Sequence, residues 1–329
     1  MKFWDVIKEV SAQPIRQEAE RLFVLALAGE PGAVAVAHAA VLGAGVTPEQ
    51  TARAAPFFFS ASPPYSAADE NRLRYADLLV SLPGGPGITD LRPADTLLVE
   101  QPEHVLELVL AHRPDLRVPL ARRFPGFRTP AAEQVIRDTS RINAEFAAIA
   151  GLSQSIPFLA PLFPVVAGTD IMVLTKNQVM MIFRLAAIYG EDMGLKARAR
   201  EIAPVIGGAL GWRTLARQLA GAIPGALGLP LRAGIAFSGT YAVGRAAQMA
   251  FDVGRRPTRR EMARIYEEGT QLARDTVGRL RARFAKPGEP SGEQKALPAP
   301  SVEPLPMPES ETEALAAGPA GRAEDRDGA

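Results

Sequence analysis

Apolar runs of strand length alternate with helical stretches over the first third of the chain, and this alternation constrains the fold more than any other feature. The apolar runs cover residues 21–28, 56–60, 77–82 and 95–99, and the helical stretches cover residues 33–42, 67–75 and 102–112. Strands that alternate with helices form right-handed βαβ units, which predicts a small, mostly parallel sheet. A capping box at Thr47-Pro48-Glu49-Gln50 predicts one more short helix.

From residue 113 onward the pattern is helical, and no run has a comparable strand signal. Thr129 followed by Pro130 predicts the start of one helix, and Thr175-Lys176-Asn177-Gln178 is a capping box before a helix over residues 179–189. A third box, Thr258-Arg259-Arg260-Glu261, predicts a long amphipathic helix. The predicted fold class is therefore α/β plus all-α.

Charge divides the 329 residues into three parts, although the whole chain has a net charge of only +1. Residues 1–112 hold 8 basic and 14 acidic side chains, residues 113–285 hold 25 and 13, and residues 286–329 hold 4 and 9. The last part also has eight prolines and few aliphatic side chains, so its burial cannot offset the entropy of ordering. We predict an α/β domain over 1–112, a helical, partly apolar domain over 113–285 and a disordered tail over 286–329.

The composition excludes several kinds of site. The chain has no cysteine, which rules out disulfides, thiolate metal sites and a cysteine nucleophile. Its three histidines, His38, His104 and His112, form no metal-ligand pair by spacing. We therefore predict no metal and no cofactor. The first ten residues (MKFWDVIKEV) carry charges throughout, so we do not expect a secretory signal.

Two glycine-rich loops follow predicted strands, which is where α/β sheets bind ligands. A phosphate loop needs GxxxxGK[ST], but counting from Gly29 the second glycine position holds Val34, and Ala35 and Val36 take the lysine and hydroxyl positions. The dinucleotide pattern GxGxxG is also absent. The other loop, residues 83–87 (PGGPG), favours a tight turn, with a residual binding surface as the alternative.

Two stretches of the helical part are distinctive: residues 119–150 (PLARRFPGFRTPAAEQVIRDTSRINAEFAAIA) and residues 169–192 (TDIMVLTKNQVMMIFRLAAIYGED). They resemble a helical domain of unknown function that occurs at the C-terminus of Era-like bacterial GTPases and in bacterial inner-membrane proteins. The resemblance extends over roughly residues 113–269, and residues 75–80 (YADLLV) resemble a strand of such GTPase domains. It implies a protein at the cytoplasmic side of the bacterial inner membrane, with the cytoplasm as the alternative.

The α/β part departs from the GTPase pattern at three places. It lacks the phosphate loop, Ser60-Ala61-Ser62-Pro63 stands where a DxPG switch is expected, and no NKxD follows the last strand. The resemblance therefore implies a shortened, degenerate GTPase-like domain, with a small P-loop-like parallel sheet but no P-loop. We expect no enzymatic activity.

Uncharged stretches in the helical part raise the question of a membrane. Residues 146–169 are 24 consecutive uncharged residues, and about 20 can cross a bilayer, but three prolines interrupt them. Residues 218–231 and 233–244 are separated by Arg232, which would cost about 2.5–3.5 kcal/mol at mid-bilayer. The residues alone leave a transmembrane or membrane-associated segment and a soluble bundle open, and the resemblance favours the membrane. Two GxxxG pairs, Gly207/Gly211 and Gly221/Gly225, favour tight helix packing in either case.

Arginine-rich segments flank these stretches over residues 113–128, 196–217 and 255–264. Basic residues beside an anionic leaflet contribute about 1 kcal/mol each, which predicts an anionic membrane surface or bilayer as partner. The alternative is a solvated helix face with pairs such as Arg264–Glu268. The sequence has no aromatic stacking platform, so we do not expect a nucleic-acid partner.

The candidate structural or interaction residues all lie in the helical part. Asp170 and Lys176 are the only charged residues between Glu145 and Arg184. We interpret Thr175 and Gln178 as helix caps and Asp170 as a partner of Lys176 or Arg184, with a ligand or partner site as the alternative. The full candidate set is Asp170, Thr175, Lys176, Asn177, Gln178, Arg184 and Arg232.

Three functions follow from these features. The leading hypothesis is a non-catalytic, membrane-associated adaptor or scaffold related to the GTPase-linked helical proteins. The alternative is a soluble helical interaction or oligomerisation module that regulates a GTPase, with a GTPase or a second copy as partner. A nucleotide-dependent enzyme is the third, and it predicts measurable GTP or ATP binding.

Overall fold

A computed structural model of the chain describes residues 11–86, 95–155, 169–191 and 228–284. All of these residues belong to one compact unit of the chain, Met1–Pro290. Several predicted features lie outside the described residues: the tail, both GxxxG pairs, the basic segment over residues 196–217 and the proline-containing half of residues 146–169.

Four parallel strands form one sheet in the order β2-β1-β3-β4. The strands are β1 (Leu25–Ala28), β2 (Phe58–Ala61), β3 (Leu78–Ser81) and β4 (Thr96–Leu98), one at each apolar run, with β2 ending one residue beyond its run. Leu25 of β1 pairs with Phe58 on one side and with Leu78 on the other. The predicted parallel sheet is confirmed, and each strand is shorter than its apolar run.

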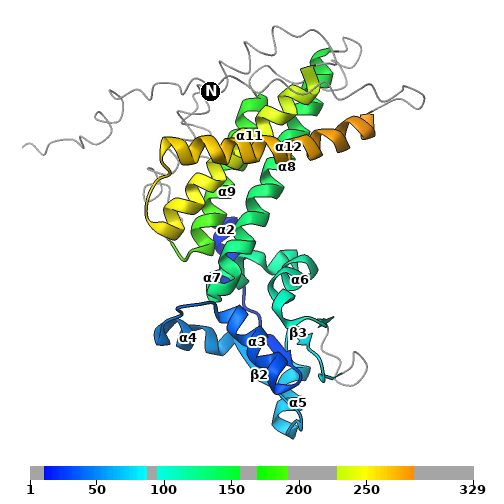
Figure 1. The fold of residues 1–329 in the computed structure, drawn as a ribbon, viewed down its shortest axis with the longest axis vertical. Helices are drawn as coiled ribbons and strands as arrows, with labels where there is room; N and C mark the ends of the chain where they lie inside the picture. Colours follow the sequence, from blue (N-terminus) through cyan, green and yellow to red (C-terminus); the bar gives the residue numbers. More distant parts are fainter. Residues whose placement is uncertain (1–10, 87–94, 156–168, 192–227, 285–329) are drawn as a thin grey trace, which may run out of the picture. The chain divides into compact units, whose positions relative to one another are not determined.

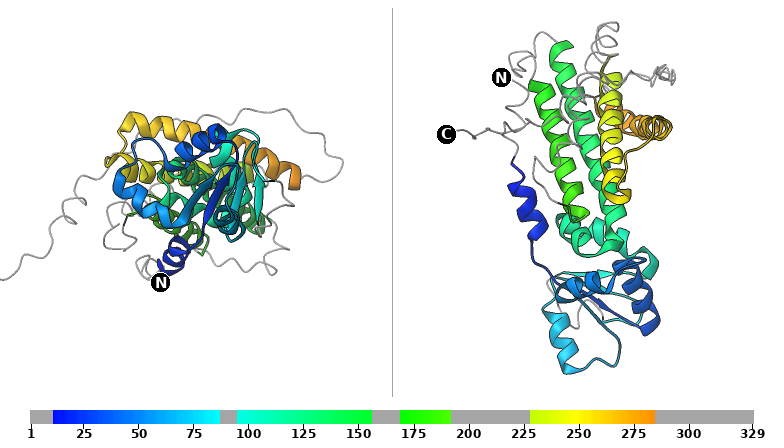
Figure 2. Two further views of the ribbon diagram at one scale, coloured as in Figure 1. Left: turned by 90° about the horizontal axis from the view of Figure 1, so that it is seen from below. Right: turned by 90° about the vertical axis from the view of Figure 1, so that its left-hand side faces the viewer.

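Helices cover both faces of the sheet (Figure 2). The leucines of β1, Leu25 and Leu27, belong to the core that includes α3 (Pro31–Leu42) and α6 (Val105–His112). The alanines of β1 face the other way and pack with Leu73 of α5 (Ala67–Arg74). This alternation follows from the two-residue period of a strand, and it places large side chains under α3 and small ones under the shorter α5.

Two short helices complete this part. The capping box at Thr47 is confirmed, because Thr47 accepts from the Gln50 N–H and Gln50 accepts from the Thr47 N–H at the start of α4 (Pro48–Ala54). The patterns above do not predict α2 (Gln13–Glu20), which packs against the helical part through Ile15 and Ala19. Single turns of 3-10 helix precede β2, α6, α7 and α8 over Ala55–Phe57, Pro102–His104, Pro114–Leu116 and Pro125–Phe127.

The part after residue 113 is helical, as predicted, in the residues that the structure describes. Its helices are α7 (Arg117–Arg123), α8 (Arg128–Ser155), α9 (Thr169–Ile188), α11 (Gly228–Val253) and α12 (Arg259–Phe284). Helix α11 packs against α8, α9 and α12, and α12 crosses α11 at a large angle (Figures 1 and 2). At Gly244 of α11 a β-carbon would lie 2.7 Å from Ile136 of α8, so glycine permits this close approach.

Two predicted helix starts are wrong. Thr175 is buried inside α9, which begins six residues earlier at Thr169, and Thr129 is the second residue of α8. The Thr-x-x-Gln pattern marks a helix start only if the preceding backbone is non-helical, and here apolar residues 171–174 continue the helix. The box at Thr258 is confirmed by reciprocal bonds with Glu261.

The predicted helix end at Gly190 is confirmed. Gly190 has a φ of 79°, and the N–H groups of Gly190 and Glu191 bond to the carbonyl groups of Ala187 and Ala186. These two bonds form a Schellman motif, in which glycine takes the left-handed conformation at low cost.

One hydrophobic core runs from the sheet into the helices. Its aromatic centre contains Phe23 and Phe124, whose ring centroids are 6.0 Å apart. Beside it the turn at Gly126 lies against the end of α3, where a β-carbon would collide with the Ala40 carbonyl oxygen. The domain boundary between residues 112 and 113 stays a prediction.

No described helix has both the length and the apolar content to cross a membrane. Within α11, Arg232 is half-buried near the start of the helix. Membrane association therefore stays a prediction.

Candidate functional site

The carboxyl edge of the sheet is the position where a doubly wound α/β protein binds its ligand. Strand order reverses between β1 and β3, because the chain adds β2 on one side of β1 and then β3 on the other. Ligands occupy the crevice at such a switch point. Residues 29–31 and 82–86, the two glycine-rich loops of the sequence, both emerge there.

These two loops bond to each other. The Glu30 N–H donates to the Pro83 carbonyl at 2.8 Å, and the Leu82 N–H donates to the Ala28 carbonyl at 2.8 Å. The Ser81 hydroxyl, which is buried, donates to the Pro86 carbonyl at 2.7 Å and holds the second loop closed.

Glycine makes this contact possible. A β-carbon at Gly85 would lie 2.5 Å from the Ala28 carbonyl oxygen and 2.8 Å from Ser81 Oγ. At Gly84, which has a φ of 71°, a β-carbon would collide with the side chain of Glu30. The crevice at the switch point is therefore filled by the chain's own backbone and by the Glu30 side chain.

Three backbone positions at this turn cannot donate an N–H to a phosphate. The Gly29 N–H donates to the Ala61 carbonyl, the Glu30 N–H donates to Pro83, and Pro31 has no N–H. A helix N-terminus binds phosphate through its unpaired N–H groups, so three residues that would contribute here do not. The turn interpretation of both loops agrees with this geometry.

A buried polar cluster lies where α8, α9 and α11 meet, and it contains two of the predicted residues. Asn143 of α8 donates to Thr240 Oγ1 of α11 at 2.9 Å, and Asn177 of α9 donates to Asn143 Oδ1 at 2.8 Å. Gln178 donates to the same Thr240 oxygen at 3.1 Å. We call Asn143, Asn177, Gln178 and Thr240 the interhelical polar cluster.

The structure separates Lys176 and Arg184 from this cluster. Lys176 directly precedes Asn177 on α9, and its side chain is exposed. Arg184 forms an ion pair with Glu18 of α2 at 3.3 Å. The predicted pairing of Asp170 concerns a side chain outside the described part of the structure. Gln178 is a cluster member and not a cap, because it lies inside α9, nine residues after the helix begins, and bonds to Thr240 of α11.

Two members of the cluster, Asn143 and Thr240, were not predicted. Their sequence signal is modest: the chain has only three asparagines, and Asn143 interrupts an apolar face of α8. The buried face of α8 contains Asn143, Ala144 and Ala148, whereas Ile142 and Ile149 are exposed by 54% and 47%. A polar residue inside a helix can be assigned to the core only when its partners are known.

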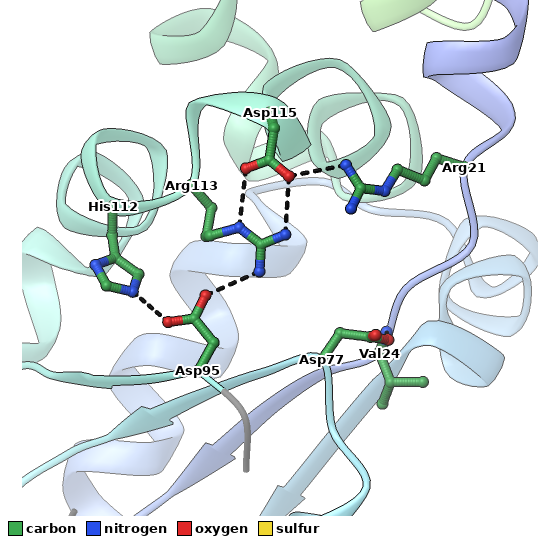
Figure 3. A network of polar contacts seen from close by, with 7 residues as sticks. All are labelled: Arg21, Val24, Asp77, Asp95, His112, Arg113 and Asp115. Atoms are coloured by element: carbon green, nitrogen blue, oxygen red, sulfur yellow. Dashed lines mark hydrogen bonds and ion pairs between the residues drawn. The ribbon is translucent and has the colours of Figure 1, made fainter.

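A network of ion pairs occupies the amino edge of the sheet (Figure 3). Arg113 donates to Asp95, just before β4, and to both carboxylate oxygens of Asp115, at 2.8–2.9 Å. Arg21 donates to Asp115 at 2.8 Å, and His112 Nε2 lies 2.5 Å from Asp95 Oδ1. The network connects the segment before β1, the start of β4 and the end of α6, so His112 has a structural role that the sequence did not indicate.

The network changes the acidity of its carboxyl groups. Hydrogen bonds from Arg113, which outweigh the effect of burial, lower the pKa of Asp115 to about 2. Burial alone would raise the pKa of Asp95, but the bonds from His112 and Arg113 lower it below its usual value. Both carboxylates are therefore charged near neutral pH and hold the cations in place.

The basic segment over residues 113–128 is largely used inside the protein. Arg117 pairs with Asp138 at 2.8 Å, and Arg122 donates to the Ala187 carbonyl at the end of α9. Arg123 donates to the carbonyl groups of Ala19 and Glu20 at the end of α2. Arginines at helix C-termini offset the helix dipole, so this part of the predicted membrane-facing charge stabilises the fold instead.

The described residues contain no group of three or more His, Asp or Glu that could hold a metal ion. Comparisons with protein-family models, with curated proteins and with solved structures find no match to this chain.

Proposed function

We propose that this protein is a non-catalytic adaptor that attaches to an anionic membrane surface through its helical part. One observation carries the proposal: the edge of the sheet where an α/β domain would bind a nucleotide is occupied by residues 29–31 and 82–86. This supports the interpretation of the α/β part as a degenerate GTPase-like domain that serves as a platform. The membrane partner rests on the +12 charge of residues 113–285 and on the resemblance to inner-membrane proteins.

Two measurements on the full chain test the proposal. Isothermal titration with GTP and with ATP should show no binding, because the N–H groups of the turn at Glu30 are engaged. Sedimentation with vesicles that contain phosphatidylglycerol should carry the protein into the pellet, and vesicles of phosphatidylcholine alone should not. Saturable GTP binding would refute the non-catalytic assignment, and failure to bind anionic vesicles would refute the membrane assignment.

A second function, a soluble helical interaction module, is favoured by a different surface. Ile142 and Ile149 of α8 and Val173 of α9 are exposed by 54%, 47% and 37%. Large apolar side chains at such positions can contact another helix. Light scattering should then show an oligomer that Ile142→Glu dissociates, whereas the adaptor proposal requires no such oligomer.

A further inference from the structure

Five exposed arginines lie between the end of α11 and the first turns of α12, on either side of Pro257. We call them the α11–α12 corner, and they are Arg255, Arg256, Arg259, Arg260 and Arg264. Between residues 252 and 264 the only carboxylates are Asp252 and Glu261. The corner therefore has an excess of positive charge within two turns of α12.

Glu261 is committed to one arginine and to the helix start. Its two oxygens accept from Arg255 at 2.8 and 2.9 Å, and one of them also accepts from the Thr258 N–H at 2.7 Å. These bonds hold the pKa of Glu261 well below its usual range. Glu261 thus neutralises Arg255 and is not available to Arg259, Arg260 or Arg264.

The pair Arg264–Glu268, named above as part of the alternative, is not formed among the described residues. Glu268 instead accepts from the hydroxyl of Tyr241 on α11 at 2.6 Å. Among the described residues, Arg259, Arg260 and Arg264 have no carboxylate within 4.0 Å. The other exposed charges of α12 after Arg264 include both signs: Glu267, Glu268, Arg274, Asp275 and Arg279.

The position of these arginines on α12 opposes helix stability. A helix has partial positive charge at its N-terminus and favours acidic side chains there. Arg259 and Arg260 are the first two residues of α12, so they add like charge to that end. An anion bound at the corner would relieve this repulsion. A solvated helix face or pairing within the protein does not explain why two arginines stand at the positive end of α12.

We propose that the α11–α12 corner is the surface that lies on an anionic phospholipid bilayer, an inference that rests on the membrane attachment proposed above. Guanidinium groups bind phosphate oxygens in a bidentate way, and Arg259, Arg260 and Arg264 are exposed for contact with separate headgroups. Val253, 60% exposed at the end of α11, adds an apolar side chain beside them. A bilayer presents phosphate and an apolar layer together, whereas a nucleic acid would leave Val253 without a function.

The test compares two charge-reversal variants of the full chain in the vesicle sedimentation assay. The corner variant is R259E/R260E/R264E, and the control is R16E/R74E/R141E, which changes the same charge at three exposed arginines elsewhere. Losing three phosphate contacts should weaken binding to phosphatidylglycerol vesicles by at least about a hundredfold. The control should bind much more tightly than the corner variant.

Each outcome decides one question. If the wild-type chain binds and both variants bind equally well, the corner is not the docking surface, although membrane attachment stands. If the wild-type chain does not bind, both proposals fail. If duplex DNA displaces the chain from vesicles at equal phosphate concentration, a nucleic acid is the better partner and the bilayer assignment is overturned. The variant R259Q/R260Q/R264Q, with circular dichroism as a folding check, gives the same comparison if charge reversal prevents folding.

Discussion

At the carboxyl edge of the sheet, two loops satisfy each other's backbone N–H and carbonyl groups, whereas in the helical bundle side chains from three helices do so. The first arrangement depends on glycine, because a β-carbon at Gly85 would overlap the carbonyl oxygen of Ala28. The second depends on amide and hydroxyl groups, with Asn143 bonded to both Asn177 and Thr240. The loops of the sheet part are therefore held together by close backbone packing that glycine permits. The helices are held in register by hydrogen bonds between polar side chains.

The largest effect is expected at the closed loops. Gly85→Ala should lower the free energy of unfolding by about 3 kcal/mol, because its β-carbon meets backbone atoms of Ala28 and Leu82 that cannot move freely. Urea unfolding measures this change. Gly32→Ala is the control: nothing lies within 4 Å of its β-carbon position, and alanine favours the helix by up to about 1 kcal/mol. Equal stability of the two variants would show that the loops are not held together by close backbone packing.

The interhelical polar cluster should have the next largest effect. Asn143→Leu removes the partner of Asn177 and one partner of Thr240, and leaving buried groups unpaired should cost about 2–3 kcal/mol. The exposed neighbour Lys176→Ala should change stability by less than about 0.5 kcal/mol. The double variant Asn143→Leu/Asn177→Leu should cost less than the sum of the single changes. Additive costs would mean that the two amides act independently.

The arginine that joins the two regions comes third. Arg123 lies over the ring of Phe57 at 4.3 Å and donates to carbonyl groups at the end of α2. Arg123→Ala should cost about 2 kcal/mol, since a partly buried cation at a helix C-terminus contributes up to about this much. Arg16→Ala, on the exposed face of α2, is the matched control and should have little effect. A thermal unfolding curve with the same midpoint for both variants would contradict the joining role.

The smallest effect is expected from the ion network at the amino edge of the sheet, and it depends on pH. The pKa of Asp115 is lowered from 3.8 to about 2 in the folded state, so its charged form stabilises the protein above pH 4. This stabilisation is lost as the pH falls toward 2. Because the Asp115 side chain is 45% exposed, solvent screening reduces its contribution to about 1 kcal/mol.

Asp115→Asn should therefore be less stable than the wild-type chain at pH 7 and equally stable near pH 2. Unfolding curves across this range measure the difference. A difference that persists unchanged at pH 2 would assign the effect of the substitution to packing rather than to the charge of Asp115.

The predictions from sequence were most accurate in the sheet part. The strand runs and the capping box at Thr47 depend on neighbours within a few residues, so local pattern was enough to place them. The capping box at Thr175 failed for the opposite reason, because Thr175 is itself buried inside α9, which already begins at Thr169. A sequence pattern of a few residues cannot indicate a contact with residues that are distant in the sequence.

The sequence by itself determined a parallel sheet followed by helices, the loss of the phosphate-binding residues and the uneven charge along the chain. Only the tertiary structure decided which polar groups are paired and therefore which charges remain for a partner. Arg113, Arg122 and Arg123 have partners far away in sequence, whereas Arg260 and Arg264 form no ion pair with another described residue. The physical reason is that a charge count is a property of composition, but pairing requires two side chains to lie within a few ångströms of each other.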